Sequence, residues 1–301
     1  MQFLELLMKI RTPALDYFML GISYIGTPVF ITGLIVWIYL NINKRTAYGI
    51  TLSFLVSGMI CQGLKIIFRI PRPWILQSDT SRFYPVEKAL ATATGYSFPS
   101  IHSQSAAAFC ESVVHYNKKK PVIITAAVML FLIPFSRMYL GCHTPLDITV
   151  GFGVGTLVNL FVWHMWNRVS RTRVSDGLIE FFLIGFALIL IFLGTSLSLN
   201  GTVEFTLMED SLKTAGLSLG FAVSFFLERR FLRFTTDGSV PHKLFRFLIA
   251  LGGFLLISAL MKQIAEDSAV VTILRYGLGS FWLFGITPLL CVRLGIMKTE
   301  R

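Results

Sequence analysis

Basic residues and histidines recur in three short stretches of the sequence, each beside a long apolar segment. A charged side chain next to apolar segments is energetically expensive and usually has a function. Guanidinium groups bind phosphate oxygens in a bidentate manner, and a lysine ammonium adds a compact positive charge. The stretches are Lys65 to Pro73 with Arg72, Pro99 to His102, and Ser136 to Asp147 with Arg137 and His143.

The residue types in these stretches predict a site for phosphate. Three cations at one place repel one another unless an anion joins them. Ser100 follows a proline at a predicted helix start, where free backbone N–H groups and the helix dipole also favour phosphate. The residues that we expect to bind the phosphoryl group are Lys65, Arg72, Ser100 and Arg137.

The two histidines, His102 and His143, supply groups for phosphoryl transfer. A neutral imidazole can attack phosphorus, and a second, protonated imidazole can donate to the leaving oxygen. Asp147 lies four residues after His143, so on a helix the two would share a face and Asp147 could accept the Nδ1 proton. This scheme needs no metal, and carboxylates near the stretches are few, so we expect no cofactor.

The composition indicates a protein that crosses a membrane several times. Of the 301 residues, 54% are hydrophobic and only 14% are charged, too few to cover a soluble domain. A spanning helix needs about 20 predominantly apolar residues, so we predict an all-α bundle of about nine transmembrane helices. The predicted spans lie near residues 17–40, 46–67, 101–116, 121–138, 145–166, 177–199, 211–229, 244–262 and 269–292.

The net charge of +11 comes mostly from short connectors between the apolar segments, which is the positive-inside pattern and not a nucleic-acid surface. We therefore predict an integral protein of the plasma or inner membrane with a cytoplasmic C-terminus. The polar loop 68–100 and the site then face the periplasm, the exterior or a lumen. Because all three stretches precede residue 168, we predict a catalytic membrane domain over 1–168 and additional transmembrane helices over 169–301.

The three stretches resemble the signature motifs of the type 2 phosphatidic acid phosphatase and vanadium haloperoxidase superfamily. The first matches K-x6-R-P, the third matches S-R-x5-H-x3-D, and the second has Ile101 in place of the glycine of P-S-G-H. The resemblance implies that His143 forms a phosphohistidine with help from Asp147 and that His102 is the general acid. It also implies that the phosphoryl oxygens are bound by Lys65, Arg72, Ser100 and Arg137. We expect the enzyme to remain active with isoleucine in place of this glycine, and we expect Ile101 to alter how the substrate enters the site.

The resemblance implies a metal-independent membrane phosphatase acting on a lipid phosphate or a polyprenyl (di)phosphate. The layout of about nine spans is more similar to the glucose-6-phosphatase branch, which makes a soluble sugar phosphate the alternative substrate. A phosphotransferase with the same site and an anion transporter are also possible readings of the same residues. Arg275, inside the last apolar segment, is either functional or a snorkelling side chain, and we assign it no role in the site.

Overall fold

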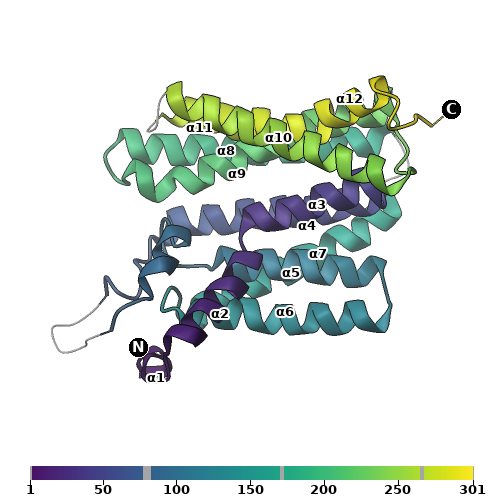
Figure 1. Cartoon of the computed structure of the whole chain (residues 1–301). Helices are drawn as coiled ribbons and strands as arrows, with labels where there is room; N and C mark the ends of the chain where they lie inside the picture. The colour runs from purple at the N-terminus through teal and green to yellow at the C-terminus, as the bar shows by residue number, and fades with distance from the viewer. Residues whose placement is uncertain (1, 77–82, 170–172, 265–267, 301) are drawn as a thin grey trace. The chain divides into compact units, whose positions relative to one another are not determined.

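The computed structural model describes residues 2–76, 83–169, 173–264 and 268–300 (Figure 1). Part of the predicted loop 68–100 therefore lies outside the described residues, as do residues 170–172 just after the predicted boundary at residue 168. No strand occurs in the described ranges, so the predicted all-α class is confirmed. The helices are α1 (Gln2–Lys9), α2 (Pro13–Ile25), α3 (Pro28–Asn41), α4 (Lys44–Phe68), η1 (Glu87–Thr92), α5 (Ile101–Tyr116), α6 (Lys120–Tyr139), α7 (Pro145–Val169), α8 (Arg173–Leu199), α9 (Phe205–Leu227), η2 (Glu228–Leu232), α10 (Val240–Ile264), α11 (Ala269–Phe281), η3 (Trp282–Ile286) and α12 (Thr287–Arg293).

Six helices of the described chain are long and apolar enough to cross a membrane, or seven if the α2–α3 pair counts as one span. The prediction of about nine spans is therefore not confirmed, and the resemblance in layout to glucose-6-phosphatase loses its support. Helix α5 has only 16 residues and is rich in serine. Helix α9 carries Glu209, Asp210 and Lys213 in its N-terminal half. The six helices are α4, α6, α7, α8, α10 and the run from α11 through α12.

The predicted span 17–40 is two helices, because the chain breaks at Gly26 and Thr27 before Pro28. A proline begins a helix readily but has no N–H to continue one. A Cβ on Gly26 would lie 2.3 Å from Cγ2 of Ile133, so the glycine also allows α2 to approach α6.

The chain forms two compact units, residues 1–31 with 56–163 and residues 32–55 with 164–301. All the predicted site residues belong to the first unit. There, the glycines of α7 allow its backbone to approach α5 closely. A Cβ on Gly151 would lie 2.3 Å from the Ser100 carbonyl oxygen, and one on Gly155 would lie 2.7 Å from that of Gln104. Helix α5 also packs along α6 (Figure 1).

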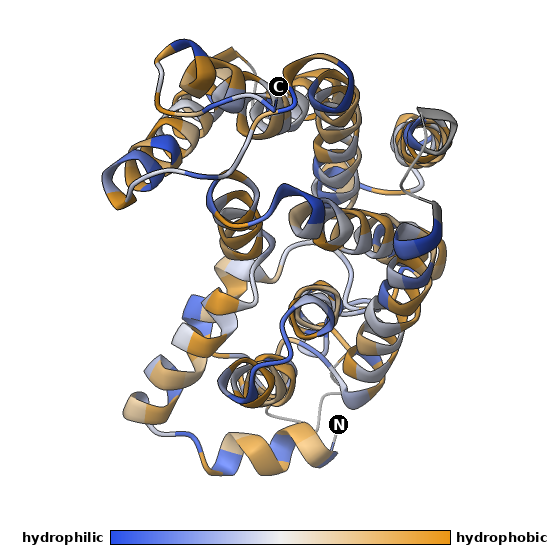
Figure 2. Ribbon diagram, turned by 90° about the vertical axis from the view of Figure 1, so that its right-hand side faces the viewer, coloured by the Kyte–Doolittle hydropathy of each residue, from blue (hydrophilic) through white to orange (hydrophobic). Residues whose placement is uncertain are grey.

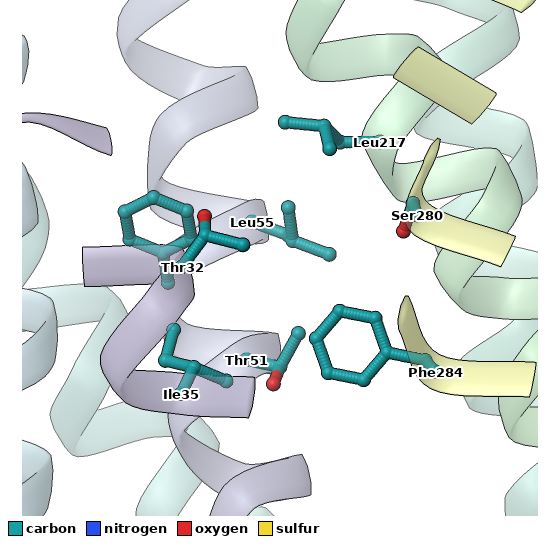
Figure 3. A pocket seen from close by; sticks show the side chains of 8 residues that line it. Thr32, Ile35, Thr51, Leu55, Leu217, Ser280 and Phe284 are labelled. Atoms are coloured by element: carbon teal, nitrogen blue, oxygen red, sulfur yellow. The ribbon is translucent and has the colours of Figure 1, made fainter. Parts of the chain in front are cut away.

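In the second unit, α9 packs against α8 and α11. A Cβ on Gly220 would lie 2.1 Å from the Gly277 carbonyl oxygen, so two glycines allow α9 and α11 to approach. A small cavity in this unit is lined by side chains that face one another from α3, α4, α9, α11 and η3 (Figure 3). It has no titratable residue in its lining, so it offers no chemistry like that of the three stretches. Its lining is Thr32, Ile35, Thr51, Phe54, Leu55, Leu217, Ser280 and Phe284.

Hydropathy follows the helices, as expected for a protein in a bilayer. Hydrophobic residues dominate the helical ribbons, and hydrophilic residues gather near helix ends and in connectors (Figure 2). Helix α10 is apolar and also largely exposed, since only 11% of its most apolar window is buried inside the protein. Its exposed apolar side chains require a lipid environment or a partner.

Candidate active site

The end of α4 brings the first two cations together. Lys65 lies in the last turn of this helix. Arg69 ends the helix in the left-handed conformation, with φ of 49°, and its N–H bonds to the Lys65 carbonyl oxygen at 2.9 Å. The chain then turns back through Pro71, and both Lys65 and Arg72 are buried. The spacing K-x6-R therefore corresponds to one helix end and the turn after it.

A tight reversal after α6 explains the spacing between Arg137 and His143. Arg137 lies in the last turn of α6 and is fully buried. Gly141 has φ of +79°, a conformation in which only glycine is unstrained. A Cβ there would also lie 2.8 Å from Cζ of Phe83. The five residues between Arg137 and His143 thus turn the chain back toward the first two cations.

Asp147 is held by the start of α7. The Thr144 N–H donates to Asp147 Oδ2 at 2.7 Å, and the Asp147 N–H bonds to Thr144 Oγ1 at 3.3 Å. This reciprocal pair is a capping box. His143 precedes the box and is not part of the helix. It therefore does not share a helix face with Asp147, contrary to what their spacing of four residues suggested. Its Nδ1 atom lies 3.6 Å from Asp147 Oδ2, which is longer than a hydrogen bond.

The second stretch begins α5. Ser100 is its N-cap residue, and the Ser100 hydroxyl accepts from the Ser103 N–H at 3.4 Å. The Ser100 N–H donates to the Asp147 carbonyl oxygen at 2.9 Å, which joins the starts of α5 and α7. His102 lies in the first turn and is buried. Ile101 is the first helical residue, so this side chain is accommodated without a left-handed backbone.

One segment before α5, residues 92–97, contacts all three cations of the site. Its backbone carbonyls accept most of the hydrogen bonds. Sequence reasoning missed this segment, because carbonyl oxygens are common to every residue type. The contacts run from Arg137 to Oγ1 and the carbonyl of Thr92, from Arg72 to the carbonyls of Thr94 and Gly95, and from Lys65 to those of Tyr96 and Ser97.

Ser97 is the second feature that sequence reasoning missed. Its hydroxyl donates to Asp147 Oδ2 at 2.7 Å and lies 3.5 Å from His143 Nδ1. Its N–H donates to the Ile70 carbonyl oxygen at 2.8 Å. Ser97 therefore contacts the first and the third stretch. No spacing rule for the known motifs points to this position, which lies two residues before Pro99.

The electrostatic setting favours a neutral His143. This residue lies in the connector between α6 and α7, outside the spanning helices. Burial holds the pKa of His143 well below 6.5, and the positive charges of Arg72, Arg137 and Lys65 lower this pKa further. The hydrogen bond to the Ser97 backbone carbonyl acts in the opposite direction and raises this pKa. The Arg72 Nη1 atom lies 3.0 Å from His143 Nε2. His102 interacts electrostatically with the same cations and with His143, so the five groups form one site.

Two polar atoms of this site lack hydrogen-bond partners in the described chain. They are Nε2 of His102 and Nε of Arg137, and both are buried. Across the described ranges, no group of three or more His, Cys, Asp or Glu side chains could hold a metal ion. Because Arg137 Nε carries a charged N–H donor, the open position beside it suits an anion.

Two family models match the chain: "PAP2 superfamily" over residues 46–171 and "PAP2 superfamily phosphatase, transmembrane extension" over residues 212–299. Phosphatidylglycerophosphatase B of Bacillus subtilis is 30% identical over 175 residues, 54% of this chain and 81% of that protein. Lipid phosphate phosphatase delta of Arabidopsis thaliana is 26% identical over 190 residues, 56% of this chain and 44% of that protein.

Two solved structures are also similar. One is Aquifex aeolicus LpxE, with a TM-score of 0.47 and 25% identity over 54% of this chain and 93% of that one. The other is the first transmembrane PAP2 type phosphatidylglycerolphosphate phosphatase from Bacillus subtilis, with a TM-score of 0.45 and 26% identity over 57% and 86%.

The fold, the site and the family matches together define an integral membrane phosphatase. The chain belongs to the PAP2 superfamily, and its second match is the transmembrane extension that some members carry. The resemblance read from the three motifs is thereby confirmed, as is the expectation of a phosphoric ester hydrolase. The predicted boundary at residue 168 and the role of each site residue stay predictions.

Proposed function

We propose that this enzyme hydrolyses the phosphate ester of a membrane lipid, or a polyprenyl (di)phosphate, through a phosphohistidine on His143. His102 is the general acid, and Asp147 supports the nucleophile. Lys65, Arg72, Ser100 and Arg137 bind the phosphoryl oxygens.

One observation supports this proposal most strongly: buried cations surround a place where two buried nitrogen atoms lack hydrogen-bond partners. Arg137 has no exposed surface, and within the described ranges no carboxylate pairs with it. Burying a charge without a counterion costs several kcal/mol. A phosphoryl group beside Arg137 Nε and His102 Nε2 would offset this cost and supply the missing hydrogen-bond partners.

The first chemical step transfers the phosphoryl group to the enzyme. His143 Nε2 attacks phosphorus, and an N–P bond forms as the bond to the ester oxygen breaks. His102 gives its proton to that oxygen, which leaves as an alcohol. The cations stabilise the charge on the equatorial oxygens. Asp147 stabilises the positive charge that the His143 ring acquires.

The second step releases phosphate. Water attacks the phosphorus of the phosphohistidine, and His102, now neutral, accepts a proton from this water. The N–P bond breaks, which returns a neutral His143 and a protonated His102. The products are inorganic phosphate and an alcohol, or a monophosphate when the substrate is a diphosphate, and neither step needs a metal ion.

A lipid substrate is supported by the surroundings of the first motif and by the relatives. Between Lys65 and Arg72, and just after them, four apolar side chains are more than half exposed, so a hydrophobic chain could lie beside the site. The names of both curated relatives describe phosphatases of phospholipids or lipid phosphates. The exposed side chains are Ile67, Phe68, Ile75 and Leu76.

The positive-inside pattern supports a site on the non-cytoplasmic face and a cytoplasmic C-terminus. Lys118 and Lys119 lie in the connector between α5 and α6, and Lys120 begins α6, at the opposite end of α5 from His102. The site therefore lies at the outer ends of α4 and α5, where an outer-leaflet lipid presents its headgroup.

The test is phosphate release by purified protein in detergent and EDTA, with His143→Ala as the inactive control. The substrates are phosphatidate, phosphatidylglycerophosphate, a sphingoid phosphate, a polyprenyl diphosphate and glucose 6-phosphate. We expect activity on at least one lipid, inhibition by vanadate and no effect of EDTA. Activity on glucose 6-phosphate alone would contradict a lipid substrate, and loss of all activity in EDTA would contradict the metal-free mechanism.

The same assay distinguishes a hydrolase from a phosphotransferase. A phosphotransferase would pass the phosphoryl group to an added acceptor and would depend on it, whereas a hydrolase releases inorganic phosphate without one. An anion transporter would instead show phosphate flux without hydrolysis in protein-containing vesicles, and its His143→Ala variant would still transport.

A further inference from the structure

We propose that Ser97 is a positioning residue that links the His143 ring to the Asp147 carboxylate during phosphoryl transfer. The proposal deepens the proposed function and rests on it, since it assigns no substrate of its own. It adds a hydroxyl group to the His143–Asp147 pair that the motif spacing suggested.

The distances among the three side chains support a bridging hydroxyl. Ser97 Oγ lies 2.7 Å from Asp147 Oδ2, whereas the direct distance from that oxygen to His143 Nδ1 is 3.6 Å. Ser97 Oγ is also 3.5 Å from His143 Nδ1. A carboxylate only accepts, so the hydroxyl hydrogen of Ser97 points to Asp147. The Oγ lone pairs of Ser97 then remain available to the N–H of the ring, alongside the Ser97 backbone carbonyl, which also interacts with this histidine.

The proton of the His143 ring lies on the side of Ser97. A guanidinium only donates hydrogen bonds, and Arg72 Nη1 lies 3.0 Å from Nε2. Nε2 is therefore the unprotonated nitrogen, and a neutral ring carries its proton on Nδ1. When Nε2 binds phosphorus, the ring becomes positive and its N–H becomes a stronger donor. In the chain of hydrogen bonds from the ring N–H through Ser97 Oγ to Asp147, the carboxylate polarises the hydroxyl and so stabilises the positive ring.

The backbone of Ser97 is fixed from two sides, so the hydroxyl is held in place. Its N–H donates to the Ile70 carbonyl oxygen at 2.8 Å, and its own carbonyl accepts from Lys65 Nζ at 3.5 Å. The side chain is 1% exposed, so water does not replace a lost hydroxyl freely. A rigid, dry position is what a group that orients a nucleophile requires.

The first test compares Ser97→Ala with Ser97→Thr. The alanine variant loses one oxygen atom and no packing volume beyond it. We expect kcat to fall about 10- to 100-fold, the range for a lost hydrogen bond to a charged group. KM should change little, since Ser97 does not touch the substrate. Thr keeps the hydroxyl and should recover part of the lost kcat.

Ser112→Ala is the matched control. Ser112 is also a buried serine of the first unit, and its hydroxyl also donates to a side chain, Asn159, at 2.6 Å. It lies outside the site, so we expect its kcat to match that of the parent enzyme. A loss equal to that of Ser97→Ala would show that any buried serine has this effect and would overturn the proposal.

A double-mutant cycle with Asp147→Asn gives a readout that a general packing effect does not change. If Ser97 acts through Asp147, Ser97→Ala should reduce kcat by less than about 3-fold in the Asp147→Asn background. Independent effects that multiply would overturn the proposal, as would a Ser97→Ala variant with unchanged kcat. Failure of the proposed function is distinguishable, because His143→Ala would then remain active whatever residue 97 is.

Discussion

Nη1 of Arg72 lies 3.0 Å from Nε2 of His143, so the proposed phosphate-binding cation and the proposed nucleophile are in direct contact. Because the guanidinium has no acceptor, the contact selects the tautomer whose Nε2 is unprotonated and accepts from Arg72. Substrate binding must draw the guanidinium to a phosphoryl oxygen before Nε2 can attack phosphorus. The same Nη1 atom donates to the Cys142 carbonyl oxygen at 3.1 Å, so Arg72 also fixes the turn that carries His143. We therefore propose two tasks for Arg72, to bind a phosphoryl oxygen and to orient the imidazole.

Replacing Arg72 by lysine should test both tasks. The charge is kept, but an ammonium cannot reproduce the planar fork of donors. We expect kcat/KM for phosphate release to fall about 100- to 1000-fold, as for loss of one donor that stabilises a transition state. Arg69→Lys is the control, since Arg69 is exposed and lies outside the site. Equal activities of the two variants would contradict the role of Arg72.

The pH dependence of activity should reflect the lowered pKa of His143. Burial and the charges of Arg72, Arg137 and Lys65 move this pKa down from 6.5, so the ring stays neutral as the pH falls through 6.5. We expect kcat/KM to decline only at lower pH. The free energy of unfolding should also decrease below pH 6.5, because the unfolded chain then binds this proton more readily.

Removing one cation should shift that acid limb. In Lys65→Met, the pKa of His143 should rise, so the decline in kcat/KM should begin at a higher pH than in the parent enzyme. The measurement is a pH–rate profile of both proteins on one lipid phosphate. An identical midpoint in the two profiles would contradict the assignment of this limb to His143.

The sequence predicted which side chains of the three stretches lie together, but not the contacts that hold them. Charge beside apolar segments and motif spacing pointed to the cations and both histidines, whose roles stay predictions. The contact between His143 and Asp147 comes from a capping box at Thr144, which the spacing of four alone did not reveal. The contacts made by the carbonyls of residues 92–97 could not be predicted for a different reason, since every residue type has a backbone carbonyl.

The helical class was predictable from composition, whereas the number of spans was not. A window of apolar residues does not distinguish a spanning helix from a buried one, and α5 shows the difficulty with its serines and only 16 residues. The break in 17–40 did have a local signal, Gly26-Thr27-Pro28, which hydropathy alone overlooks.

The glycines of α7 provide a packing prediction with an internal control. A methyl on Gly151 would lie 2.3 Å from the Ser100 carbonyl oxygen, whereas Gly153 has nothing within 4 Å of an added Cβ. Gly151→Ala should reduce the free energy of unfolding by about 1–3 kcal/mol and should lower kcat by displacing Ser100. Gly153→Ala should instead stabilise the helix by about 0.5–1 kcal/mol. Thermal unfolding in detergent with a parallel activity assay measures both, and equal effects would contradict the packing.

Arg246 provides a stability prediction for the second unit. Its buried guanidinium donates to the carbonyl oxygens of Leu40, Thr236, Asp237 and Ile296. A lysine cannot reach this set, and each buried polar group left unpaired costs about 1–3 kcal/mol. We expect Arg246→Lys to lower the unfolding temperature by several degrees. His242→Ala, on the exposed first turn of the same helix, should not lower it, and the reverse ranking would contradict this role.

The most direct test of the mechanism is to trap the phosphoenzyme. Purified protein is mixed with a ³²P-labelled lipid phosphate, quenched within milliseconds in base and digested, and the labelled peptide is sequenced. The mechanism predicts a label on His143 that survives alkali, is lost in acid, and is absent from His143→Ala. A label on another residue, or turnover by His143→Ala at the parent rate, would contradict it.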